Sequence, residues 1–334
     1  MKNILKYLIT MMLCMTLCIT CNNEWEDEQF DHYVSFVAPL NDQGVSPIYL
    51  RYKANGTVTY QVPLMVSGST VNDKNLNVFV AVDPDTLDAL NVERFSTRTE
   101  LFFKRLPNPQ FFTFPGTVNI PSGSSHATLP IDFKFNGIDM VDKWVVPLKI
   151  ENDPNYQANP RRHYKRALLR IFPFNDYSGV YGATGFLMYF KDTGTSSAPL
   201  ALEFKTAYVV DENTVFFYAG IVTDEWTDRA NYKIFFRFND DYDEDLNSGT
   251  ITINADNPNI KLNVVGTPTY RISERMDDTR PYLKRRITTI YMEYDFTDYT
   301  SMPGYEIDYL VRGSLTMERV SNTQIPDEDQ AIQW

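Results

Sequence analysis

Hydrophobic and polar residues alternate with a period of two along most of this chain. In residues 126–133, HATLPIDF, every second side chain is apolar, and histidine, threonine, proline and aspartate occupy the positions between them. The same alternation runs through residues 233–238, KIFFRF, and residues 287–296, ITTIYMEYDF. This period is typical of half-buried β-strands, in which successive side chains point to opposite faces. The pattern therefore predicts a chain built mainly from strands.

Residues 144–150, WVVPLKI, form another predicted strand, with Trp144 on the same face as the apolar residues at every second position. Pro147 then lies on the outer face and favours an edge strand or a bulge, because proline has no N–H for a central ladder. Helix signals are few. The best is DPDTLDAL, where Asp83 is placed to cap and Pro84 to start a helix of one or two turns. We therefore predict an all-β fold.

A domain boundary is visible near residues 172–178. A strand that ends at a proline is followed by NDYSGVYGATGFLMYF, whose glycines permit the bends that a closing barrel requires. We predict a β-sandwich at residues 31–173 and a barrel or strongly curved sheet at residues 174–320. The polar tail at residues 321–334 is expected to be loosely held, with Trp334 as its docking candidate.

The first twenty residues have the parts of a secretory signal peptide. Lys2 and Lys6 precede an apolar stretch that is too short for a plain membrane anchor. Cleavage before Cys21 leaves one cysteine in the mature chain, which can form no internal disulfide and no zinc site by itself. The segment LCIT before Cys21 resembles a bacterial lipoprotein signal, although Cys18 and Thr20 replace the usual residues. We predict a lipid on Cys21; the alternative is ordinary secretion with an incidental thiol.

Residues 21–30 are acidic and polar, which suits a solvated tether. The run NNEWEDE resembles the export mark that directs surface lipoproteins of Gram-negative glycan-utilisation systems to the outer face. The alternative is a charged linker without a signal. On the first interpretation, the protein is anchored in the outer membrane, at the cell surface, through the lipid on Cys21.

The net charge of −12 bears on the choice of partner. Phosphate binding needs concentrated lysine and arginine, so the charge argues against nucleic acid, and it also disfavours anionic lipid surfaces. A neutral ligand is compatible with it. Aromatic residues make up 14% of the chain, which suits a strand-rich folded protein.

Two stretches resemble a known pair of domains. Residues 106–150, from LPNPQFF to VVPLKI, resemble the immunoglobulin-like N-terminal domain, of uncharacterised function, found in outer-membrane lipoproteins of glycan-utilisation loci. YSGVYGATG at residues 177–185 and GSLTMERV at residues 313–320 resemble the start and end of the lipocalin-like β-barrel domain that often follows it. The resemblance implies a surface lipoprotein that captures oligosaccharide or polysaccharide beside a porin-type importer.

Catalytic motifs are not found in the sequence. It contains no G-x-S-x-G and no H-E-x-x-H, and its histidines, His32, His126 and His163, are scattered. A glycosidase needs only two carboxylates at a set separation, but none sits in a recognisable pattern. We expect no enzyme activity and no cofactor.

The densest acidic cluster is NDDYDEDLNSG at residues 239–249. Asp241, Asp243 and Asp245 fall at the first, third and fifth positions of a calcium loop, but Leu246 occupies the glycine position and Thr252 the position of the bidentate glutamate. We favour an acidic hairpin tip without a metal; loosely bound Ca²⁺ is the alternative.

An exposed aromatic ring flanked by polar side chains is the pattern expected for sugar contact, because a pyranose has an apolar C–H face. Trp226 in VTDEWTDRANY fits this description best. The hydrogen-bonding residues predicted beside it are Asp224, Asp228 and Arg229. Tyr299 and Tyr305 are the next candidates. The alternative is that Trp226 closes one end of the barrel core.

The sequence thus predicts a non-catalytic, surface-anchored glycan-binding lipoprotein, with neutral or weakly charged glycans favoured over polyanions. Three alternatives remain open. A structural or adhesive lipoprotein would use the same anchor without binding sugar. A glycoside hydrolase or its accessory would use a carboxylate pair. A carrier of a small hydrophobic molecule would need an open apolar barrel interior.

Overall fold

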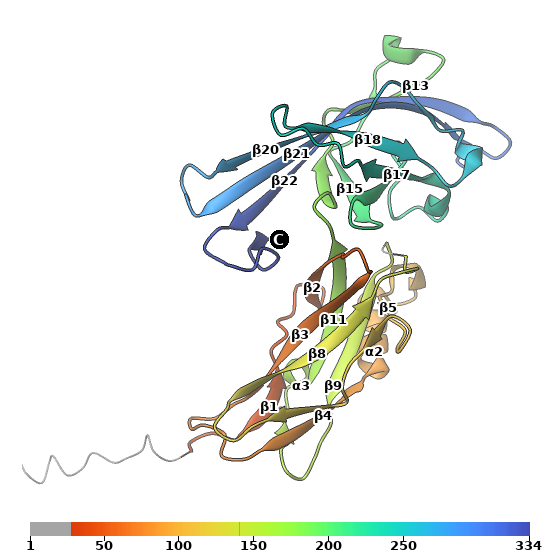
Figure 1. Cartoon of the computed structure of the whole chain (residues 1–334). Helices are drawn as coiled ribbons and strands as arrows, with labels where there is room; N and C mark the ends of the chain where they lie inside the picture. Colours follow the sequence, from red (N-terminus) through yellow and green to blue (C-terminus); the bar gives the residue numbers. More distant parts are fainter. Residues whose placement is uncertain (1–27, 140) are drawn as a thin grey trace, which may run out of the picture.

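The computed structural model describes residues 28–139 and 141–334, which form two β-rich bodies (Figure 1). The chain crosses from one to the other between β11 (Arg166–Phe174) and β12 (Gly179–Gly182). The predicted leader at residues 1–20, the lipidation site Cys21 and most of the tether at residues 21–30 lie outside the described residues. Within the described part of the chain, no helix is long and apolar enough to cross a membrane.

The N-terminal body is a β-sandwich. In the described residues, one sheet has the strand order β10-β1-β3-β8-β6 and the other the order β2-β11-β9-β4-β7, with β5 beside β9. The further strands are β1 (Tyr33–Phe36), β2 (Ser46–Arg51), β3 (Thr57–Val66), β4 (Leu76–Val82), β5 (Lys104–Arg105), β6 (Phe112–Thr113), β7 (Thr117–Ile120), β8 (His126–Lys134), β9 (Trp144–Ile150) and β10 (Gln157–Ala158). The helices are α2 (Pro84–Phe95), α3 (Arg162–Lys165) and the 3-10 turn η1 (Thr99–Leu101).

Alternation along the strands builds the sandwich core. In β8, Leu129, Ile131 and Phe133 are fully buried, while Thr128 and Asp132 are turned away from the core. The inward side chains of both sheets form one hydrophobic cluster. Burying such side chains stabilises the fold by roughly 1.5–3 kcal/mol each. The all-β prediction is confirmed.

Pro147 corrects the prediction of an edge strand or bulge, because β9 lies inside its sheet between β11 and β4. Along one side of β9, β5 pairs with Trp144 and Val145, and β4 pairs from Leu148 onward. Pro147 occupies the break between these two partners, so its missing N–H costs no ladder bond.

Helix α2 is also longer than predicted, at 12 residues, and Asp83 makes no side-chain cap. Its carboxylate instead accepts a hydrogen bond from the Thr86 hydroxyl and pairs with Arg166 at 2.9 Å. The helix is held by packing: Leu87 joins a small cluster with Val145 and Leu168 on the outer side of the sheet. Tertiary contact therefore extends the helix beyond what its sequence signals indicate.

The C-terminal body is a barrel. In the chain as described, β22, β12, β15, β16, β17, β18, β20 and β21 follow one another in a ring that the pairing of β21 with β22 closes. Its strands are β13 (Phe186–Phe190), β14 (Leu200–Ala201), β15 (Phe204–Val209), β16 (Thr214–Tyr218), β17 (Lys233–Phe238), β18 (Ser248–Asn254), β19 (Asn263–Val264), β20 (Thr269–Met276), β21 (Leu283–Asp298), β22 (Ile307–Asn322) and β23 (Ile332–Gln333). The 3-10 turns are η2 (Gly194–Ser196), η3 (Arg229–Tyr232) and η4 (Pro258–Ile260).

Large aromatic side chains fill the barrel interior. The fully buried ones include Tyr181, Phe217, Tyr232, Phe236, Phe238, Tyr270 and Tyr294. Inward aromatic residues alternate with outward residues along β17, as the pattern KIFFRF predicts. The filled interior argues against a carrier that holds a hydrophobic molecule inside the barrel.

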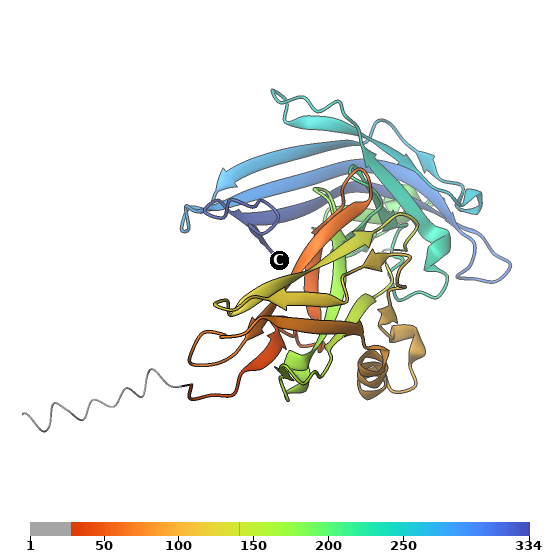
Figure 2. The same ribbon diagram turned by 60° about the horizontal axis from the view of Figure 1, so that its bottom comes forward.

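The C-terminal tail is not loosely held, contrary to the prediction. Strand β23 pairs with β22, and Ala331 and Ile332 are buried. Trp334 reaches the sandwich, where it contacts Tyr49 and Phe174. In both ribbon views the C-terminus lies between the barrel and the sandwich (Figures 1 and 2). Burial of these few apolar residues therefore fixes the tail in place, although most of its residues are polar.

Candidate functional site: a cleft between the two domains

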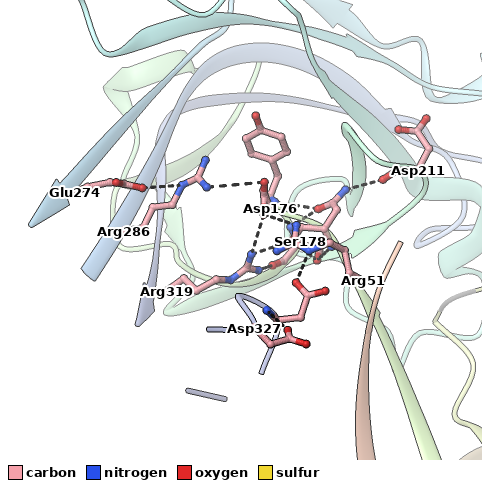
Figure 3. A network of polar contacts seen from close by, with 11 residues as sticks. Arg51, Asp176, Ser178, Asp211, Glu274, Arg286, Arg319 and Asp327 are labelled. Carbon is pink, nitrogen blue, oxygen red and sulfur yellow. Dashed lines mark hydrogen bonds and ion pairs between the residues drawn. The ribbon is translucent and has the colours of Figure 1, made fainter. Parts of the chain in front are cut away.

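The segment that links the two domains is fixed by arginine side chains (Figure 3). Arg319 on β22 donates to the backbone carbonyls of Asn175 at 2.9 Å and Ser178 at 2.7 Å. Arg51 on β2 donates to Asp176 at 2.7 Å and also pairs with Asp329 in the tail. Linker, sandwich, barrel and tail therefore share one polar network.

Asp176 is the carboxylate at the centre of this network. Besides the contact with Arg51, Arg286 approaches it at 3.8 Å and Arg319 at 3.9 Å. Burial by itself would raise the pKa of Asp176, but the hydrogen bond from Arg51 and the three guanidinium charges lower the pKa below its ordinary value. The carboxylate is therefore ionised at neutral pH and holds the arginines together.

Each domain also contributes a buried residue to the core of the other. Val141, from the sandwich loop, belongs to the barrel cluster, and Val209, on β15, belongs to the sandwich cluster. Lys233 on β17 pairs with Asp139 at 3.3 Å across the same junction. These contacts hold the two domains in one arrangement.

That arrangement leaves a cleft of about 530 Å³ between the domains. One wall is aromatic and comes from the face of β2 and β11 that points away from the sandwich core. Tyr49 and Phe172 are directly opposite in the parallel pairing of these strands, with ring centroids 5.2 Å apart. Trp334 stacks on Tyr49 and keeps 51% of its surface exposed.

The opposite wall belongs to the barrel and mixes polar with apolar side chains. It includes Val180 on β12, Thr206 and Tyr208 on β15, Asp224 from the loop after β16, and Glu318 on β22. Burial and then the charge of Asp224 raise the pKa of Tyr208, so this hydroxyl stays protonated and can donate. An aromatic wall facing polar side chains can bind a sugar ring and its hydroxyl groups together.

Of the residues singled out from the sequence, Asp224 lies in this cleft. Trp226 is half-buried and packs on the barrel core, which is the arrangement that the alternative interpretation requires. Arg229 turns toward the sandwich, where it approaches Asp142 at 3.8 Å. Asp228 accepts a hydrogen bond from the Thr300 hydroxyl. The structure thus uses several of these polar side chains for internal contacts.

Tyr299 and Tyr305 lie in the loop between β21 and β22. The Tyr299 hydroxyl accepts a hydrogen bond from Asn257 at 2.9 Å, and its ring contacts Tyr232. Tyr305 is 68% exposed. Through the contact of Asp228 with Thr300, this loop is joined to the segment that carries Trp226. The predicted residues therefore gather at one end of the barrel, although they do not form a continuous cleft.

The acidic cluster at residues 239–249 forms the turn between β17 and β18. Asp241 accepts a hydrogen bond from the backbone N–H of Thr250 at 2.9 Å, and Asp243 accepts from the N–H groups of Asp245 and Leu246. Among the described residues, no group of three or more histidine, cysteine, aspartate or glutamate side chains is arranged to hold a metal ion.

The sequence reasoning missed the aromatic wall. Tyr49, Phe172 and Trp334 come from three distant parts of the chain, and their proximity depends on the pairing of β2 with β11 and of β22 with β23. One signal was available: in IFPF, Phe172 falls on the face opposite the core residue Ile171. An outward aromatic residue beside a domain boundary favours a contact or binding surface.

Comparisons with known proteins agree with this two-domain description. A family model described as a domain of unknown function (DUF4973) matches residues 25–154, and a second, described as a C-terminal domain, matches residues 165–316. No curated protein matches the chain.

Solved structures give closer relatives. A Bacteroides ovatus protein of unknown function is 45% identical, with a TM-score of 0.80 over 90% of this chain and 100% of its own. A multidomain protein including DUF1735, also from Bacteroides ovatus, is 43% identical, with a TM-score of 0.79 over 90% and 100% of the two chains. A protein described as an auxiliary nutrient binding protein from Bacteroides thetaiotaomicron is 39% identical, with a TM-score of 0.74 over 91% and 100%.

The fold and the cleft define a β-sandwich joined to a β-barrel, with an aromatic-lined site between them. The chain belongs to the same family as these Bacteroides proteins, and the DUF4973 model matches its residues 25–154.

Proposed function

We propose that the protein is a non-catalytic glycan-binding protein of the cell surface, which captures oligosaccharide in the cleft between its domains. The observation that carries this proposal is the wall of Tyr49, Phe172 and Trp334 facing Thr206 and Tyr208 across about 530 Å³. The description of one relative as an auxiliary nutrient binding protein supports a role in nutrient capture.

The chemistry of the cleft suits a sugar. Contact with an aromatic ring removes the C–H face of a pyranose from water, while the hydroxyl groups find donors and acceptors on the barrel wall. Contacts of this kind are individually weak, and a surface tether makes them useful because it raises the local concentration beside a transporter. A porin-type importer is the partner that we propose on this basis.

The surroundings of the two carboxylates that line the cleft, Glu318 and Asp224, favour sugar binding over sugar hydrolysis. Glu318 pairs with Arg285 at 2.7 Å, and Asp224 is exposed to solvent. A glycosidase requires one carboxyl group that donates a proton and a second that acts as base or nucleophile. Glu318 is instead neutralised by Arg285, and the exposed Asp224 lacks the burial that a proton-donating carboxyl group requires.

The proposed location is the outer membrane surface, with the lipid on Cys21. The described chain begins at Glu28, whose carboxylate accepts hydrogen bonds from the N–H groups of Ser69 at 2.7 Å and Thr70 at 2.9 Å. Strand β1 starts at the end of the sandwich remote from the barrel (Figure 1). An anchor at Cys21 would therefore place the sandwich next to the membrane as a spacer and the cleft farther out.

A glycan array with the soluble chain starting at Glu24 tests the function. We expect reproducible binding to at least one oligosaccharide. Failure to bind any glycan would favour the structural or adhesive alternative.

Mass spectrometry of the native protein tests the proposed location separately. A diacyl or triacyl group on Cys21 is expected, and an unmodified N-terminus would overturn the proposed membrane anchor.

A further inference from the structure

An arginine in the cleft lacks the partners that a buried charge normally has. Arg170 lies on β11, on the face that points away from the sandwich core, with its guanidinium 5.0 Å from the ring centroid of Phe172 and 5.7 Å from that of Phe103. Its Nε and Nη1 atoms are buried and have no hydrogen-bond partner among the described residues. Buried polar groups are normally paired, so these two unpaired nitrogens of Arg170 call for an explanation.

A second cation lines the same cleft. Lys143 is half-buried, and no carboxylate of the described residues lies within ion-pair distance of its ammonium group. The nearest carboxylate along the chain, Asp142, is bound to Lys104 at 2.8 Å. Burial lowers the pKa of Arg170 to about 10, with Asp142 acting in the opposite direction, so Arg170 is still charged at neutral pH.

The other charged groups of the cleft are either paired or exposed to solvent. Glu318 is paired with Arg285 at 2.7 Å, and the Asp224 side chain is exposed to solvent at the border of the cleft. The two nitrogens of Arg319 that point toward the linker donate to the carbonyls of Asn175 and Ser178. The unpaired charge that is withdrawn from solvent in the cleft is therefore positive, even though the whole chain is acidic.

We infer that the cleft binds an acidic saccharide, with one anionic substituent at Arg170 and Lys143 and a sugar ring against the aromatic wall. This inference rests on the proposed function and makes it more specific. A uronate carboxylate and a sulfate ester share the required chemistry, because both accept hydrogen bonds from a guanidinium. A polyanion fits less well, because Asp224 and Glu318 border the same cleft.

Isothermal titration calorimetry on the soluble chain tests the inference with three matched probes. These are a trisaccharide with a single glucuronate, its carboxyl-reduced neutral counterpart, and a counterpart with a single sulfate ester. We expect one of the acidic probes to bind about tenfold more tightly than the neutral one, with a preference that weakens as salt rises. The acidic probe that binds more tightly identifies the anionic group.

Variants then assign the preference to the two cations. Arg170→Gln should reduce the affinity for the acidic probe about tenfold and leave the neutral probe within about twofold, since a hydrogen bond to a charged group is lost in one case only. Arg161→Gln, which changes an exposed arginine outside the cleft, is the matched control and should have no effect. If Arg170→Gln does not fold, Lys143→Gln decides, with an expected loss of about threefold for the acidic probe.

The outcomes separate this inference from the proposed function. Equal binding of all three probes, or an acidic preference that survives both substitutions, would overturn the inference and leave glycan binding intact. An array and a calorimeter that both show no sugar binding at all would remove the proposed function as well.

Discussion

The indole ring of Trp334 lies parallel to the phenol ring of Tyr49, with centroids 4.1 Å apart and an interplanar angle of 3°. Tyr49 belongs to the sandwich, whereas Trp334 ends a tail that pairs with the last barrel strand. Arg319 lies over the same indole at 5.5 Å. The last residue of the chain thus bridges the domains and forms one end of the aromatic wall.

The arginine network around Asp176 is expected to control how firmly the domains are joined. Asp176→Asn removes the negative charge shared by Arg51, Arg286 and Arg319. We expect the free energy of unfolding to fall by roughly 1–3 kcal/mol at neutral pH, a range that allows for partial exposure of the carboxylate. Urea unfolding measures this, and Asp73→Asn, at an exposed aspartate, is the control and should change little.

The same variant has a defined pH dependence. Because the folded-state pKa of Asp176 is lowered, its contribution to stability is present above the unfolded-state pKa of about 3.9 and is lost as the pH falls through the folded-state value. The difference between parent and variant should therefore shrink below about pH 4. A difference that stays constant down to pH 2 would contradict the assignment.

Lys205 is a buried cation in the barrel wall. It is 6% exposed, and its ammonium group donates to the carbonyl of Gly220 at 2.6 Å. Burial lowers its pKa to about 7. Between that value and the unfolded-state pKa of about 10.4, the unfolded chain binds a proton that the folded chain does not, so stability should rise with pH in this window.

Lys205→Met is therefore expected to stabilise the protein by roughly 1–3 kcal/mol at or below neutral pH. Above about pH 10 the gain should largely disappear. Thermal unfolding across this pH range checks both statements, with Lys53→Met at an exposed lysine as control. A variant that is less stable than the parent at pH 6 would show that the buried ammonium contributes a net stabilising contact.

Strand β22 requires glycine at position 313, where it lies between β13 and β21. Gly313 has φ +126°, and a Cβ built there would lie 1.9 Å from the carbonyl oxygen of Gly185. We expect Gly313→Ala to lower the free energy of unfolding by more than about 2 kcal/mol, because both the backbone conformation and the contact are lost. Gly116→Ala is the control, since a Cβ there meets nothing within 4 Å. Equal melting temperatures for the two variants would contradict the close approach of Gly313 to Gly185.

The strands could be predicted from the sequence because burial imposes a period of two on a half-buried sheet, and residues such as Leu129 and Ile131 follow it. The predictions that failed concerned residues whose environment is set by neighbouring strands and surfaces from elsewhere in the chain. Pro147 is tolerated in a central strand because two neighbouring strands end on either side of it. The tail is ordered because Ala331 and Ile332 find a buried surface that the tail composition does not reveal.

The candidate site could be predicted only in part. Asp224 was identified from its place in a polar loop, and it lines the cleft. Tyr49, Phe172 and Trp334 could not be grouped, because residues so far apart in the sequence come together only through strand pairing. Trp226 has the flanking residues of a sugar platform, but whether such a ring is buried depends on the core beneath it.

The central claim is that glycan binds between the domains, and a comparison of two tryptophan variants tests it most directly. The dissociation constant for the best ligand from the array is measured by calorimetry for the parent, Trp334→Ala and Trp226→Ala. We predict that Trp334→Ala weakens binding about tenfold or more, whereas Trp226→Ala stays within about twofold. Full affinity in Trp334→Ala together with loss of binding in Trp226→Ala would contradict the cleft and place the ligand at the barrel-end loops.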